Sequence, residues 1–175
     1  MMSHALFTAL RFVHVVVGVC WVGAIVFIAV FLLPAVRAAG PAGGAVMQDL
    51  TQVRRVPALL TVGGILTVLS GLALYWNDSA GFASKAWLAS GTGMTFGFGA
   101  AMAILTLVIG SAVNAPTAKR IGALGGAIRA AGGPASAEQA AQMQRLQTRL
   151  LNAQRLTAVL LLLATAAMSV ARYVR

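Results

Sequence analysis

Residues 12–34 read FVHVVVGVCWVGAIVFIAVFLLP, an apolar stretch that is long enough to cross a bilayer as one helix. The stretch holds one histidine, His14, and an ionisable side chain in an apolar span is costly and usually faces a partner. Gly18 and Trp21 follow His14 by four and seven positions, so the three residues share one face of the helix. They form a flat notch, which suits a planar ligand or a closely packed neighbouring helix equally well.

The composition of the whole chain predicts an integral membrane protein. Its 175 residues are 59% hydrophobic and only 9% charged, whereas soluble domains are roughly 25% charged. Nineteen glycines suit helices that pack closely in lipid. We therefore expect an all-α fold with one transmembrane domain over residues 1–175, a four-helix bundle whose spans cover about residues 12–34, 56–76, 85–113 and 155–173.

Breaks between the spans are marked by turn residues. Glycine, proline and arginine in residues 35–55 end the first helix, and the polar residues 77–84 predict a hairpin between the second and third spans. Small residues line the second span (Gly63, Gly64, Ser70, Gly71), and Gly93 and Gly97 form a GxxxG motif in the third. Residues 114–133 predict a short interfacial helix.

The fourth helix is expected to be much longer than a bilayer requires. Ser136 and Gln139 resemble a capping box, and residues 137–173 contain no glycine or proline. The first half of this helix is amphipathic, with Leu150 on the inner side and Arg149 on the outer side. We expect this half to be a cytoplasmic extension and the second half to span the membrane.

The formal net charge of +10 fits the positive-inside rule better than nucleic-acid binding, because the basic residues flank the spans without interleaved aromatic residues. Nine of them fall on one side of the predicted membrane and four on the other. The distribution places both long loops in the cytoplasm and both termini outside a bacterial inner membrane. The nine are Arg37, Arg54, Arg55, Lys119, Arg120, Arg129, Arg145, Arg149 and Arg155, and the four are Arg11, Lys85, Arg172 and Arg175.

This orientation brings four residues to the outer level of the membrane: Arg11, His14, Lys85 and Arg172. With Arg11 at the outer end of the first span, His14 lies about 4.5 Å deeper. His14 and Lys85 could therefore meet in the outer leaflet.

The acidic residues Asp49, Asp78 and Glu138 all lie outside the spans, so a carboxylate-driven carrier and a Ser/His/Asp hydrolase are both disfavoured. A neutral imidazole is the commonest metal ligand, and thioethers of Met94 or Met102 suit copper(I) or haem iron. The single cysteine, Cys20, is expected to be a small buried hydrophobe, and His4 a solvated interfacial residue. For His14, a ligand role and a hydrogen bond to a threonine or backbone carbonyl both stay open.

The spacing His14-x6-Trp21-x-Gly23 resembles the first span of copper-resistance D-domain proteins and of HemJ-type protoporphyrinogen oxidases. The resemblance covers roughly residues 8–115. It includes Leu32 to Pro34, Arg54-Arg55, Pro57-Ala58-Leu59, Gly71-Leu72 and Lys85. Residues 35–40 and 111–120 depart from the aromatic and basic segments of the HemJ type.

The resemblance implies a haem b protein in which His14 and Lys85 are the essential pair. Gly18 and Trp21 would contact the haem, and Lys85 would be a second iron ligand or, with Arg11 and Arg172, would pair with porphyrin carboxylates. The enzyme would oxidise a porphyrinogen and reduce quinone. Two other functions stay open: a copper-handling protein that uses His14, Cys20 and methionines, and a non-catalytic subunit of a homo-oligomer or larger membrane complex. The lipid bilayer is the expected partner, and nucleic acid is not.

Overall fold

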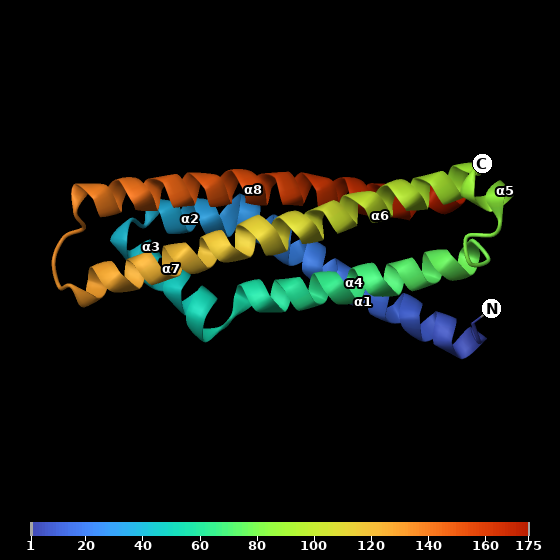
Figure 1. The fold of residues 1–175 in the computed structure, drawn as a ribbon, viewed down its shortest axis with the longest axis horizontal. Coiled ribbons are helices and arrows are strands. Elements are labelled where there is room, and N and C mark those ends of the chain that lie inside the picture. The colour runs from blue at the N-terminus through green and yellow to red at the C-terminus, as the bar shows by residue number, and fades with distance from the viewer. Residues whose placement is uncertain (1, 175) are drawn as a thin grey trace. The chain divides into compact units, whose positions relative to one another are not determined.

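The structure is a computed structural model that describes residues 2–174, in which helices are joined by short turns and no strand occurs. Four helical segments in this range are long and apolar enough to cross a membrane: His4–Ala38, Val56–Asp78, Gly91–Ala130 and Ala137–Tyr173. The all-α fold is therefore confirmed (Figure 1), as is the prediction of four helices that are able to cross a membrane by length and composition.

The elements in chain order are α1 (His4–Phe27), η1 (Ile28–Leu32), α2 (Leu33–Ala38), α3 (Pro41–Gln48), η2 (Asp49–Val53), α4 (Val56–Asp78), α5 (Lys85–Leu88), α6 (Gly91–Ile109), η3 (Gly110–Asn114), α7 (Ala115–Ala130), α8 (Ala137–Val170) and η4 (Ala171–Tyr173). The helix α1 begins eight residues before the predicted start of the first span. The third span is interrupted, because α5 ends at Leu88 and α6 starts at Gly91.

Prolines explain two widened turns inside the long helices. The π-helical turns η1 and η3 end two residues before Pro34 and Pro116. A proline cannot donate to the carbonyl four residues earlier, and its ring clashes with that carbonyl. In the turn before each proline, the backbone N–H instead donates to the carbonyl five residues earlier. Leu33 N–H donates to Ile28 O, and Ala115 N–H donates to Gly110 O. Residues 115–130 consequently continue the third long segment as α7, where the sequence predicted a separate interfacial helix.

The start of α8 follows the predicted capping box. Ser136 N–H donates to Gln139 Oε1 over 2.9 Å, and Gln139 N–H donates to Ser136 Oγ over 3.1 Å. Both donors would otherwise be unpaired at the helix start. Leu150 is buried and Arg149 is exposed, as the amphipathic pattern predicted.

The chain divides into two compact units, each of which takes segments from the long helices. Unit 1 comprises Met1–Gly23, Val62–Leu107 and Val159–Arg175. The Met2 backbone N–H donates to Asn77 Oδ1, and Thr92 Oγ1 donates to Val174 O. The start of α1 thus lies beside the end of α4, and the start of α6 beside the end of the chain, so both helix pairs are antiparallel.

Small residues set the helix contacts of unit 1. The GxxxG motif receives a side chain of α4, because the Tyr75 hydroxyl donates to Gly93 O and an added Cβ at Gly97 would lie 3.3 Å from the same hydroxyl. The close contact falls instead at Gly99, where an added Cβ would lie 3.0 Å from Met168 Cγ and 3.3 Å from Ala164 O of α8.

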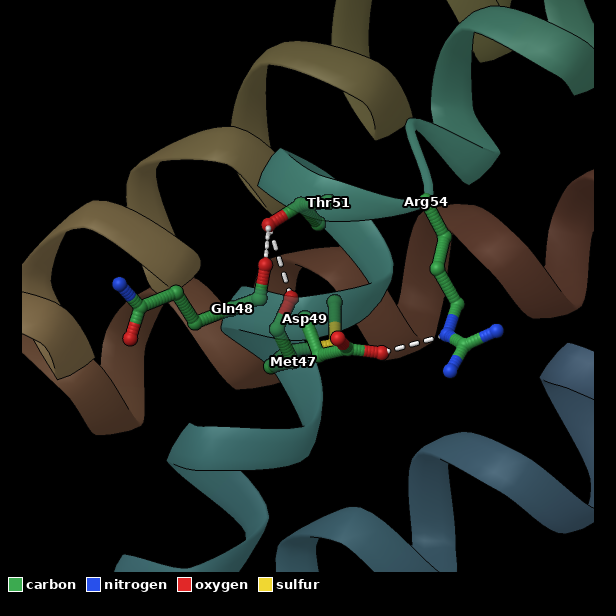
Figure 2. A network of polar contacts seen from close by, with 5 residues as sticks. All are labelled: Met47, Gln48, Asp49, Thr51 and Arg54. Atoms are coloured by element: carbon green, nitrogen blue, oxygen red, sulfur yellow. Dashed lines mark hydrogen bonds and ion pairs between the residues drawn. The ribbon is translucent and has the colours of Figure 1, made fainter.

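Unit 2 comprises Ala24–Thr61 and Val108–Ala158. The chain turns at Gly40 (φ 55°) from α2 into α3, and α3 packs against α7 (Figure 1). Its apolar core contains Leu33, Val36, Met47, Ala118, Ile121 and Leu150. Between α3 and α4, the Thr51 hydroxyl donates to Met47 O and Arg54 Nε lies 2.6 Å from Asp49 Oδ2 (Figure 2).

Candidate functional site

The structure places His14 against α4, within unit 1. His14 Nδ1 lies 2.8 Å from the backbone oxygen of Thr67 and 3.5 Å from Ser70 Oγ. A carbonyl oxygen only accepts hydrogen bonds, so Nδ1 carries the proton. Ser70 Oγ donates its hydrogen to Leu66 O over 2.6 Å, so toward Nδ1 it can only accept, which agrees with a proton on Nδ1. We call His14, Thr67, Ser70 and Gly71 the His14 cluster.

Gly71 makes room for the imidazole ring. A Cβ at this position would lie 2.6 Å from His14 Cε1 and 2.9 Å from Nδ1, closer than carbon atoms approach one another in proteins. The glycine was predicted as part of a small-residue seam, and the structure shows that this part of the seam receives the histidine. The ring is held on two sides, by the Thr67 carbonyl and by the bare backbone at Gly71.

The second ring nitrogen of His14 is uncommitted. In a neutral imidazole with its proton on Nδ1, Nε2 carries a lone pair. Nε2 makes no hydrogen bond within residues 2–174, and His14 is half-buried. An N–H donated to a backbone carbonyl is the usual support of a metal-bound histidine, because it fixes the tautomer and orients the ring. The same bond also serves to fasten α1 to α4.

The notch formed by Gly18 and Trp21 is occupied by α4. Trp21 is only 4% exposed, and a Cβ at Gly64 would lie 2.7 Å from Trp21 Cζ2. A Cβ at Gly18 would lie 3.3 Å from Thr67 Cγ2. Of the two occupants that the sequence left open, the structure thus shows a neighbouring helix.

The three basic residues predicted near His14 are exposed: Arg11, Lys85 and Arg172. Arg11 precedes His14 by three positions in α1 and so lies on the same side of the helix. It does not mark the helix end, because α1 starts at His4 and His14 lies about 15 Å along it. Lys85 begins α5 beyond the end of α4, whereas the His14 cluster lies seven or more residues before that end. Within residues 2–174 no hydrogen bond joins Lys85 to His14.

The structure does not bring His14 and Cys20 into a group of metal donors among the described residues. Among the described residues no group of three or more His, Cys, Asp or Glu side chains could hold a metal ion. Cys20 is exposed, which differs from the predicted buried position, and Met94 is 60% exposed. His4 is exposed, as expected.

A second polar cluster, in unit 2, was missed from the sequence. Asn114 Nδ2 donates to Gln154 Oε1 over 2.9 Å and to Thr157 Oγ1 over 3.3 Å, and Gln154 Nε2 lies 3.5 Å from Ile25 O. All three side chains are buried, and Asn114 Oδ1 has no hydrogen-bond partner within the part of the chain that the structure describes. We call these three residues the amide cluster. It holds no titratable group, so its chemistry is that of helix packing.

The His14 cluster can therefore offer one imidazole nitrogen, His14 Nε2, to a metal centre. No family model, curated protein or solved structure matches this chain. The resemblance to copper-resistance D-domain and HemJ-type proteins therefore stays a prediction, and the function has to be argued from the geometry of the described residues.

Proposed function

We propose that this chain is a multi-pass membrane protein that binds haem b, with His14 as an axial ligand. One observation carries the proposal: the His14 Nδ1 proton is committed to the Thr67 carbonyl, which leaves the Nε2 lone pair for iron. A histidine within a membrane-spanning helix is costly, so a function is expected for it. Binding of iron by Nε2 would give each of the two ring nitrogens a partner.

The donor set favours a macrocycle over a bare ion. Copper or zinc needs several protein donors, and the described residues contain no group of three or more His, Cys, Asp or Glu side chains that could hold such an ion. A porphyrin brings four nitrogens of its own, so one protein ligand can hold it. The residues present therefore fit haem better than copper. Bound haem would supply one-electron chemistry, with a porphyrinogen or quinone as the expected redox partner.

The porphyrin carboxylates need cationic partners. Arg11 is exposed and shares the side of α1 that carries His14, so its guanidinium is the nearest candidate along the chain. Lys85 and Arg172 are the other exposed basic residues of the described part of unit 1. We assign them the same role rather than iron ligation.

The proposed location is a bacterial inner membrane, with both long loops in the cytoplasm and both termini outside. The support is the distribution of charge, since all nine basic residues of the two long loops belong to unit 2. The amphipathic first half of α8 would then lie on the cytoplasmic side.

The test is the absorption spectrum of the purified full-length protein, produced with haem available. We expect a Soret band that is lost in His14→Ala and retained in the matched variant His4→Ala, because His4 is exposed at the start of α1. A wild-type protein without a Soret band, or an unchanged band in His14→Ala, would overturn the proposal.

A second candidate is a non-catalytic membrane subunit, and the same hydrogen bond favours it, because the bond joins α1 to α4. The variant His14→Gln separates the two. A glutamine amide can still donate to the Thr67 carbonyl but supplies no imidazole lone pair. If His14→Gln keeps the thermal stability and the wild type has no Soret band, the role of His14 is structural.

A further inference from the structure

Three of the four long helices are longer than a bilayer requires. Val56–Asp78 has 23 residues, about 34 Å of helix, which matches a hydrocarbon core of about 30 Å. The other three have 35, 40 and 37 residues, which correspond to about 52 to 60 Å. Roughly 20 to 30 Å of each therefore lies outside the hydrocarbon or crosses it at a tilt.

The basic residues are concentrated in unit 2, on the long helices and in the turn that precedes α4. Nine of the 13 lysines and arginines are found there, and all nine are exposed. Arg54 is paired with Asp49 (Figure 2). Within residues 2–174 the other eight have no ion pair, and we call them the basic surface: Arg37, Arg55, Lys119, Arg120, Arg129, Arg145, Arg149 and Arg155.

Residues of the basic surface lie next to buried residues of helices that pack against one another. Ala118 and Ile121, which flank Lys119 and Arg120 in α7, are 7% and 2% exposed, and Leu150, beside Arg149, is 4% exposed. An added Cβ at Gly125 of α7 would lie 3.3 Å from Gly44 O of α3, so these helices are in close contact. The cationic side chains are therefore presented by helices whose backbones are already ordered.

We infer that the basic surface binds the phosphate headgroups of anionic phospholipids in preference to zwitterionic ones. Basic residues next to membrane spans are attracted to anionic lipid by about 1 kcal/mol each, about fivefold in association. Residues 32–61 and 108–158 contain no Phe, Tyr or Trp, so the surface lacks the stacking platform of a single-strand nucleic-acid site. The lipid headgroups, in contrast, are next to these helices wherever they leave the bilayer.

The experiment uses full-length protein reconstituted in phosphatidylcholine vesicles with a trace of spin-labelled lipid. The fraction of motionally restricted label, measured by electron paramagnetic resonance, gives the association of phosphatidylglycerol relative to phosphatidylcholine. We expect a several-fold preference for phosphatidylglycerol that decreases at high salt. The paired substitution Lys119→Gln and Arg120→Gln should remove much of this several-fold preference.

The matched control removes two exposed charges from unit 1, with Lys85→Gln and Arg172→Gln. It should lower the preference by less than the Lys119/Arg120 pair does, because Lys85 and Arg172 are not part of the basic surface. An equal effect of both pairs would show that net charge alone is responsible, and this outcome, or equal association of the two lipids, would overturn the inference. Co-purified nucleic acid or acidic protein that is lost in the Lys119/Arg120 variant would overturn it in favour of another partner.

Discussion

The two units use different chemistry to hold helices together. Unit 1 contains all three tryptophans and both tyrosines. Its characteristic contact is the hydrogen bond from the His14 side chain to the Thr67 carbonyl, beside Gly71. Unit 2 has no tryptophan or tyrosine, carries nine basic residues and joins its helices through the amide cluster. Tryptophan and tyrosine are enriched at both membrane interfaces, whereas lysine and arginine are enriched on the cytoplasmic side, so the basic residues are the more informative difference between the two units.

The largest expected effect concerns the glycine contact of unit 1. In Gly71→Ala the new methyl group would lie 2.6 Å from His14 Cε1, so the ring has to leave the Thr67 carbonyl. Overpacking of this kind costs about 1–3 kcal/mol. We expect a clearly lower midpoint of thermal unfolding in mild detergent.

Gly63→Ala is the matched control, because a Cβ at that position meets only Val17 Cγ1 at 3.9 Å. This substitution should be neutral or stabilising, since alanine favours a helix over glycine by up to about 1 kcal/mol. Equal stability of the Gly71 and Gly63 variants would show that the imidazole does not depend on this contact.

The next effect concerns the amide cluster of unit 2. Asn114→Leu removes two hydrogen bonds and leaves Gln154 Oε1 without its donor. The loss is partly offset because Asn114 Oδ1 is already buried without a partner among the described residues. Hydrogen bonds between membrane helices average about 0.6 kcal/mol, so we expect a total loss of about 1 kcal/mol.

A double-mutant cycle with Gln154→Leu isolates the Asn114–Gln154 pair. The double variant should be less destabilised than the sum of the two single variants, because neither then leaves a buried amide unpaired. Additive effects would mean that the two amides do not interact. Unit 2 would then not be held by the amide cluster, and the difference from unit 1 in how helices are joined would disappear.

Much of the fold follows from apolar length and turn residues. The four helices, the capping box at Ser136 and the inward position of Leu150 were all predicted, because each is a local or periodic signal. The start of α1 at His4 was missed, since residues 4–11 look like a polar lead yet contain good helix formers. The exposure of Cys20 depends on which face of α1 meets a neighbour, which an evenly apolar helix does not reveal.

The contacts of the candidate site depend on register between distant segments. His14 and Thr67 are 53 residues apart, and the partner is a backbone oxygen, which every residue has. The sequence allowed a structural hydrogen bond from His14 to a threonine or a backbone carbonyl, but it could not say which residue supplies the acceptor. Asn114 and Gln154 are 40 residues apart, and nothing in the sequence near either residue indicates that they pair once the helices are packed. The pairing of His14 with Lys85 rested on their predicted depth and on the family resemblance, and it stays a prediction.

The smallest expected effect tests the charges of unit 2. Asp49 and Arg54 form an ion pair whose side chains are 47% and 68% exposed, so Asp49→Asn should change the free energy of unfolding by less than about 1 kcal/mol. The same substitution frees Arg54 and adds a cation to the basic surface. If that surface selects anionic lipid, the preference for phosphatidylglycerol should rise slightly in Asp49→Asn and not in Asp78→Asn of unit 1, as measured with spin-labelled lipid. A change in stability larger than that of Gly71→Ala would instead show that the turn between α3 and α4 depends on this ion pair, and that unit 2 is held by charge as well as by its amides.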